Sequence, residues 1–303
     1  MALAAVTGQR PFPARRNAPP HNSSETFCFL DIGSVTYSDK EIQPMSGGSF
    51  NVLVERNRGA LRPLGTIVFV NSLATTAGMW DRVVARIDED FDVVRFDQRD
   101  RGGPKGHSPF VLDDLVSDLF DVLDAEHIED AHIAGVSLGG LVSLRAAALE
   151  PRRTKSATAM CCAARFSQDV WVERGKQVRE TGISPLVPQV IDRWFTTDFQ
   201  RRQPFVVEQH RKMLASTDPA GYAFACDVLA AADVTPDLPG IKVPLLVLSG
   251  EADSANPLAD QDVIARNVPS ARHEVLRNTA HLAPVAEPEL VARLVSEHAR
   301  AHN

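Results

Sequence analysis

The stretch Gly135-Val136-Ser137-Leu138-Gly139 decides the fold of this chain. The apolar run 131–134 precedes it, and a run with helical spacing, Gly140 to Leu149, follows it. A G-x-S-x-G segment between a strand and a helix is typical of a nucleophile elbow, a turn so sharp that only small residues fit around the serine. The turn lifts the hydroxyl out of the sheet and puts the next backbone N–H beside it. The segment therefore indicates a reaction type, with serine as the nucleophile, as well as a fold.

Strand and helix signals alternate along most of the chain. Apolar, β-branched runs predict strands at 50–54, 66–70, 92–96, 131–134, 157–162, 243–248 and 272–276. Helical spacing predicts helices at 112–123, 140–149 and 289–299. This alternation predicts an α/β fold, with a mostly parallel central sheet and helices on both of its faces.

One long segment breaks this alternation. It is rich in helical signals, contains Trp171, Trp194 and Phe195, and lies between two predicted core strands. We interpret it as an inserted helical cap at about 164–235, placed over the carboxyl ends of the strands, where open α/β sheets bind ligands. The cap belongs to a single domain, 27–303. Residues 1–26 are expected to form a flexible N-terminal extension, with a transit peptide or a misplaced start codon as alternatives.

Composition excludes several classes of function. The formal net charge of −7 over 303 residues gives no electrostatic support for nucleic-acid binding. No apolar run approaches the roughly 20 residues of a membrane helix. The four cysteines lack the spacing of a disulfide framework or a zinc site, so we expect buried thiols and a cytoplasmic location. The sequence is compatible with a homo-oligomer.

Two further residues complete a catalytic triad in the order Ser, acid, His. Asp253 follows the strand 243–248 in a loop, with Glu251 as the less favoured competitor. His281 lies in the loop before the last helix, whereas His273 falls within a strand and His298 near the C-terminus. A serine hydroxyl needs a base to take its proton, and a carboxylate to orient that base.

An oxyanion hole requires two backbone N–H groups aimed at the developing negative charge. We expect these from Leu138, directly after the nucleophile, and from Leu73 in the loop that follows the strand 66–70. The sequence contains no H-E-x-x-H, C-x-x-C or G-x-x-x-x-G-K motif, so we expect neither a metal nor a cofactor.

Over about 49–299 the chain resembles the α/β-hydrolase superfamily, and within it the 3-oxoadipate enol-lactonases of aromatic catabolism. The resemblance rests on the loop Val70-Asn71-Ser72-Leu73, the elbow, the acid and base segments, and a cap pattern that includes Trp171, Arg174 and Arg193-Trp194-Phe195. It implies a lactonase acting on a small carboxylated lactone. Arg174 or Arg193 would then bind the substrate carboxylate, and Trp171 and Trp194 would wall the pocket; ordinary solvated or packing roles are the alternatives for all four.

The chain departs from that family in one loop. Where relatives commonly have Asp-x-Arg-Gly-His-Gly, this chain has Asp97-Gln98-Arg99-Asp100-Arg101-Gly102-Gly103-Pro104. Two other functions remain open: a carboxylesterase or cofactor-free perhydrolase with the same triad, and a ligand receptor on this fold that barely turns over.

Overall fold

The computed structural model describes residues 41–44, 51–56, 63–101 and 108–303. Every described residue belongs to the unit that spans 39–303. The predicted extension 1–26 and the part of the Asp97–Pro104 loop beyond Arg101 lie outside the described residues.

The described strands form one eight-stranded sheet in the order β1-β2-β4-β3-β5-β6-β7-β8. Strands β1 and β2 are antiparallel to their neighbours, and pairing from β4 through β8 is parallel. After β4 the chain crosses back past β3 to form β5, so β3 has β4 on one side and β5 on the other. Because β3 and β5 are parallel neighbours, their carboxyl ends lie next to each other. The strands are β1 Glu41–Pro44, β2 Asn51–Glu55, β3 Gly65–Val70, β4 Phe91–Phe96, β5 Ala131–Val136, β6 Thr154–Met160, β7 Leu245–Gly250 and β8 Ala271–Leu276.

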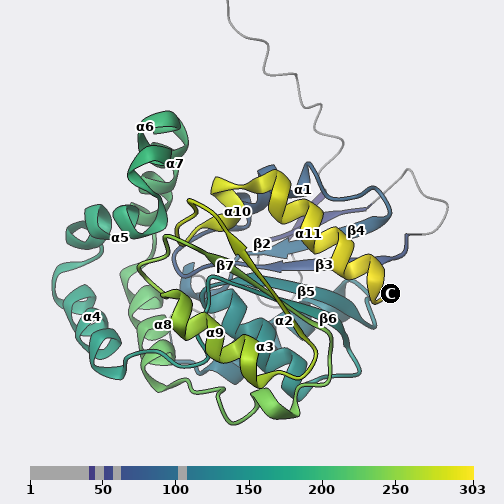
Figure 1. Cartoon of the computed structure of the whole chain (residues 1–303). Helices are drawn as coiled ribbons and strands as arrows, with labels where there is room; N and C mark the ends of the chain where they lie inside the picture. The colour runs from purple at the N-terminus through teal and green to yellow at the C-terminus, as the bar shows by residue number, and fades with distance from the viewer. Residues whose placement is uncertain (1–40, 45–50, 57–62, 102–107) are drawn as a thin grey trace, which may run out of the picture. The chain divides into compact units, whose positions relative to one another are not determined.

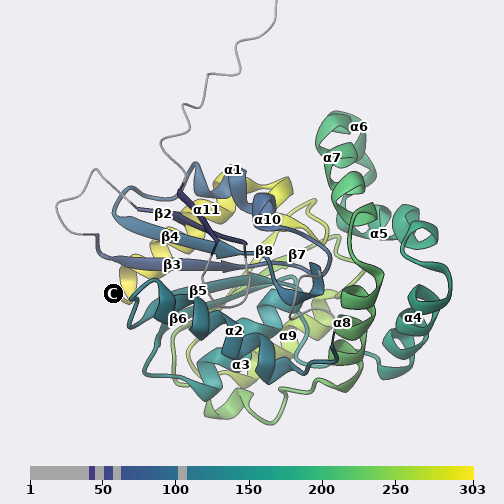
Figure 2. The same ribbon diagram turned by 180° about the vertical axis from the view of Figure 1, so that it is seen from behind.

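Helices cover both faces of the sheet, so the central strands are buried on both sides. Helix α11 (Pro288–Ala301) lies beside α1 (Asp81–Val84) on one face, and α2 (Leu112–Ala125), α3 (Leu138–Leu149) and α9 (Leu258–Asn267) cover the other (Figures 1 and 2). All six residues of β4, β5 and β7 are buried. Strands buried along their whole length are typical of parallel sheets with helices on both faces; here they also bury a few polar side chains, among them Arg95 in β4 and His132 in β5.

The cap leaves the sheet after β6 and returns before β7. It consists of α4 Gln168–Thr181, α5 Val187–Trp194, α6 Thr197–Arg202, α7 Pro204–Ala215 and α8 Pro219–Ala231, gathered at the carboxyl ends of the strands (Figure 1). The two crossing segments meet at a neck, where the Val234 N–H donates to the Ala164 carbonyl over 2.9 Å and Arg165 pairs with Asp233 over 3.8 Å.

The predicted α/β architecture, with a mostly parallel sheet, helices on both faces and a helical cap, is confirmed. Some boundaries were wrong. The strand predicted at 157–162 is β6, Thr154–Met160, and it ends earlier because Cys161 has a positive φ of 46°. A positive φ takes the chain out of the extended conformation that a strand requires.

Candidate active site

Ser137 occupies a strained turn between β5 and α3. Its φ of 58° and ψ of −116° fall outside the regions that ordinary residues prefer, a conformation that costs about 1–3 kcal/mol and is commonly found at functional sites. A Cβ added to Gly135 would lie 2.1 Å from the Gly139 carbonyl oxygen, and one added to Gly139 would lie 2.2 Å from that of Val70. Glycine is therefore required on both sides of the serine.

Asp253 and His281 form a buried pair. The Nδ1 atom of His281 lies 3.0 Å from Oδ2 and 3.2 Å from Oδ1 of Asp253, and both residues are only 5% exposed. Asp253 also accepts hydrogen bonds from the backbone N–H groups of Ala255 (2.8 Å) and Asn256 (3.0 Å). These two N–H groups hold the Asp253 carboxylate in place. The carboxylate accepts from Nδ1–H of His281, which leaves Nε2 of the imidazole free to act as an acceptor.

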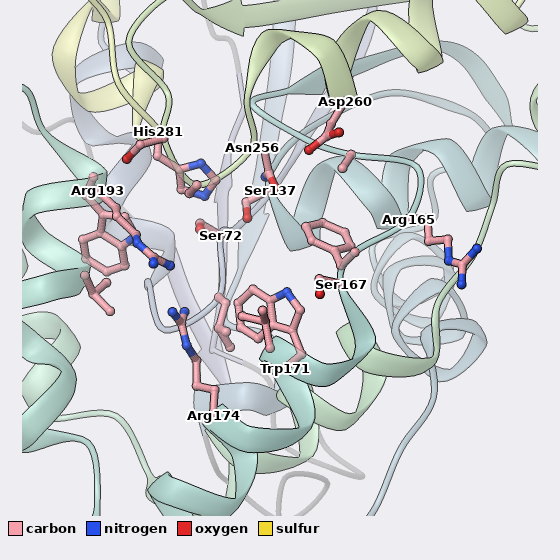
Figure 3. A pocket seen from close by; sticks show the side chains of 18 of the residues that line it. Ser72, Ser137, Arg165, Ser167, Trp171, Arg174, Arg193, Asn256, Asp260 and His281 are labelled. Atoms are coloured by element: carbon pink, nitrogen blue, oxygen red, sulfur yellow. The ribbon is translucent and has the colours of Figure 1, made fainter.

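Ser137 and His281 line the same cavity, of about 260 Å³. Figure 3 shows the imidazole and the Ser137 hydroxyl directed toward one another at one end of the cavity. The competing carboxylate, Glu251, is exposed and accepts a hydrogen bond from the Asn278 N–H instead. The structure thus brings together the three residues that the sequence predicts as a triad.

The two predicted oxyanion donors lie on neighbouring elements. Leu138 is the first residue of α3, so its N–H has no partner within the helix. Leu73 lies in the loop after β3 and lines the cavity together with Ser72. The Ser72 carbonyl accepts hydrogen bonds from the N–H and the hydroxyl of Thr75, over 3.1 and 2.8 Å.

All four predicted substrate contacts line the cavity: Trp171, Arg174, Arg193 and Trp194. The Arg174 guanidinium stacks over the Trp171 ring, 4.6 Å from its centroid. Burial and the nearby Arg174 charge lower the pKa of Arg193. Within the described part of the chain, neither arginine forms a salt bridge, and Figure 3 shows both guanidinium groups directed into the same region of the cavity. Two partly desolvated cations without a carboxylate partner favour an anionic ligand.

Sequence reasoning missed several residues at this site. Phe166, Tyr222 and Asn256 line the cavity, and Asn256 also donates from Nδ2 to the Cys161 carbonyl over 2.8 Å. An asparagine three residues after a predicted acid is a usable signal, because short polar side chains commonly bond to nearby backbone in loops. No sequence signal points to Phe166.

A second buried carboxyl lies behind the loop that carries Leu73. Asp100, in the short 3₁₀ helix η2 (Arg99–Arg101), is fully buried, and its Oδ2 accepts a hydrogen bond from the Ala74 N–H over 2.7 Å. Burial raises the pKa of this carboxyl to about 7, against the lowering effects of the Ala74 N–H and of Arg101. Asp97 on the same segment raises it further, and Tyr222 and Cys226 of α8 also lie within electrostatic range.

The structure adds three observations about other predicted features. Cys161, Cys162 and Cys226 are buried free thiols, as expected, whereas Cys28 lies outside the described residues. In the described ranges, no group of three or more His, Cys, Asp or Glu side chains is arranged to hold a metal ion. Nor does any described helix have the length and apolar character needed to cross a membrane.

Residues 67–294 match the model of the alpha/beta hydrolase family. The chain belongs to the alpha/beta hydrolase family. This alpha/beta hydrolase is 34% identical over 231 residues to 3-oxoadipate enol-lactonase 1 of Acinetobacter baylyi, covering 76% of this chain and 86% of that protein. Enol-lactonase 2 of the same organism is 33% identical over 227 residues, covering 74% and 84%.

Among solved structures, this alpha/beta hydrolase is similar to the enol-lactonase from Burkholderia xenovorans LB400, with a TM-score of 0.79 and 32% identity. The similarity covers 84% of this chain and 98% of that one. The predicted superfamily and the predicted class, a carboxylic-ester hydrolase, are confirmed.

Proposed function

We propose that this protein is a serine hydrolase that opens a small carboxylated lactone, with 3-oxoadipate enol-lactone as the substrate. The observation that carries the proposal is the placement of Arg174 and Arg193 in the same cavity as Ser137 and the Asp253–His281 pair. The names of the two relatives with about a third of their residues identical support the same substrate.

In the proposed reaction, His281 Nε2 takes the proton of Ser137 as Oγ attacks the lactone carbonyl carbon. The Leu73 and Leu138 N–H groups stabilise the oxyanion that forms. The ring C–O bond then breaks, and the enol oxygen leaves with the proton from His281. Because a lactone is cyclic, this leaving group stays attached to the acyl chain. Water, deprotonated by His281, attacks the acyl-enzyme and releases the open-chain acid, returning the proton to Ser137.

The cavity chemistry supports an anionic substrate. A substrate carboxylate between Arg174 and Arg193 would receive charge-assisted hydrogen bonds, which contribute about 1.5–3 kcal/mol each. The indole of Trp171, under the Arg174 guanidinium, limits the directions that this cation can take. Trp171 and Trp194 would wall the apolar side of the lactone ring. The chain itself supplies the nucleophile, the base and the oxyanion donors, so the mechanism uses no cofactor, and we place the reaction in the cytoplasm.

One experiment tests the substrate class: kcat/KM for the enol-lactone, for neutral lactones of the same ring size and for simple esters. Arg174→Gln and Arg193→Gln should each lower kcat/KM for the anionic lactone about 10- to 100-fold and leave neutral substrates within threefold. Arg165→Gln is the matched control, because Arg165 also lines the cavity but is 67% exposed and paired with Asp233. Equal losses on charged and neutral substrates would contradict a carboxylate-binding role.

A second experiment tests the nucleophile. Ser137→Ala should lower hydrolysis of all these substrates at least about 10³-fold, because the triad acts as a unit, and a serine-directed phosphonate should label Ser137. Activity of the variant within tenfold of wild type would overturn the mechanism. Preference for neutral esters in the wild type would favour the carboxylesterase or perhydrolase. Tight ligand binding without any burst on an activated ester would favour the receptor.

A further inference from the structure

The orientation of the Leu73 N–H depends on the peptide group that it shares with the Ser72 carbonyl. This group is planar and trans, so the carbonyl and the N–H point in opposite directions. Thr75 holds the carbonyl through its N–H and its hydroxyl. With the carbonyl held toward Thr75, the Leu73 N–H points the opposite way. Ser72 and Leu73 both line the cavity.

The next residue, Ala74, has an unusual backbone and is held from both ends. Its φ of 65° is in the left-handed region that a residue with a Cβ disfavours. Its N–H donates to Asp100 Oδ2 over 2.7 Å, and its carbonyl accepts from Arg101 Nη1 over 3.1 Å. The side chains of two consecutive residues, Asp100 and Arg101, therefore form hydrogen bonds with both backbone polar groups of Ala74.

Arg101 also reaches the cap. Its Nη1 donates to the Met213 carbonyl over 3.0 Å and to the Thr217 hydroxyl, and its Nη2 donates to the Ser216 hydroxyl over 3.3 Å. These partners lie at the C-terminal end of α7 and in the turn before α8. One guanidinium thus joins the loop that carries Leu73 to the cap that covers the cavity.

We propose that Asp100 and Arg101 are positioning residues that hold Ala74 in its left-handed conformation and so keep the Leu73 N–H aimed at the substrate oxyanion. Neither residue touches the cavity; both act through Ala74. They are also the two positions at which this chain departs from the Asp-x-Arg-Gly-His-Gly pattern of the family it resembles. The proposal rests on the proposed function, because it requires Leu73 to be an oxyanion donor.

The test compares variants of the full-length chain on an activated neutral ester, with active sites counted by phosphonate titration. Asp100→Ala removes the acceptor for the Ala74 N–H. It should lower kcat per active site about 10- to 100-fold, since loss of one complete oxyanion donor costs 10²–10³-fold, while KM stays within threefold. Asp100→Asn keeps an acceptor oxygen and should recover at least half of the lost activity on a logarithmic scale.

A second substitution separates positioning from simple stability. Glycine adopts a positive φ without the penalty of a Cβ. Adding Ala74→Gly to Asp100→Ala should therefore raise kcat about fivefold or more, without lowering KM. Asp114→Ala is the matched control, because its Oδ2 also accepts one backbone N–H, from Val111 over 2.8 Å, outside the cavity. It should leave kcat per site within twofold of wild type.

The outcomes are distinguishable. Unchanged kcat per site in Asp100→Ala, or a loss that neither Asn at 100 nor Gly at 74 restores, overturns the positioning role. If Asp100→Ala does not fold, Arg101→Ala carries the same test through the Ala74 carbonyl, and unchanged kcat per site there overturns the proposal. Failure of the phosphonate to label Ser137 in the wild type would instead overturn the proposed function.

Discussion

Asp100→Asn should flatten the dependence of stability on pH between about pH 4 and pH 8. Burial raises the pKa of the Asp100 carboxyl from 3.8 to about 7. Between these two values the folded protein holds a proton that the unfolded chain has released. The unfolded state therefore binds fewer protons, and the free energy of unfolding falls as pH rises through this window.

The size of the effect follows from the pKa difference. A shift of about three units corresponds to about 4 kcal/mol, at about 1.4 kcal/mol per unit. In the unfolded chain this carboxyl is largely ionised by pH 5, so part of the loss in the free energy of unfolding has already occurred at that pH. About 3 kcal/mol of the loss remains between pH 5 and pH 8. Asparagine has no charge to bury, so the variant avoids this loss while keeping an oxygen that accepts from the Ala74 N–H.

Urea denaturation followed by tryptophan fluorescence, at a series of pH values and constant ionic strength, measures the quantity directly. The difference between the two proteins isolates Asp100, because every other titrating group is common to both. The free energy of unfolding of the variant, relative to that of the wild type, should rise by about 3 kcal/mol from pH 5 to pH 8. A constant difference would refute the reasoning. A difference that grows in the opposite direction would mean that Asp100 stabilises the fold as an ordinary carboxylate.

Three other substitutions test features described above. Gly139→Ala puts a Cβ 2.2 Å from the Val70 carbonyl oxygen and should destabilise the fold by about 3 kcal/mol or more; a melting temperature within two degrees of wild type would contradict this contact. Asn256→Ala loses the hydrogen bond to the Cys161 carbonyl and should lower kcat about tenfold by loosening the acid loop, whereas unchanged kcat would limit Asn256 to cavity lining. Burial lowers the pKa of His132 to about 4, so this residue contributes about 3 kcal/mol to the free energy of unfolding above about pH 6.5, and the contribution is lost as pH falls toward 4. His132→Gln should reduce the acid-side slope in urea denaturation by this amount, while His298, whose pKa burial also lowers to about 4, keeps its own slope; an unchanged slope would contradict the role of His132.

The sequence was sufficient to predict the elements that depend on local chemistry. Glycines around Ser137 identify the elbow because no other residue fits so close to a neighbouring backbone. The loop positions of Asp253 and His281 follow from strand and helix periodicity and from the chain order of such triads. These features need only the sequence near each residue, together with the topology that alternating strands and helices predict.

Features that depend on contacts between distant segments were not predictable in this way. The hydrogen-bond partners of Ala74 include Asp100 and Arg101, which lie 26 and 27 positions further along the chain. The left-handed φ of an alanine has no sequence signature. The sequence shows that the loop Asp97–Pro104 differs from the family pattern, but it does not show which contacts Asp100 and Arg101 make. Likewise, Phe166 reaches the cavity only because the cap folds back over the sheet.

The neck of the cap has a consequence for engineering. Ala164 and Val234 are joined by a backbone hydrogen bond, and Arg165 pairs with Asp233, so the chain enters and leaves the cap at a single crossing. The segment between them is therefore a cassette that can be grafted from another member of the family without breaking any strand of the sheet. A chimera built at this crossing should take its preference for anionic or neutral substrates from the protein that supplies the cap. This requires that the grafted cap still places a backbone carbonyl where Arg101 now binds that of Met213.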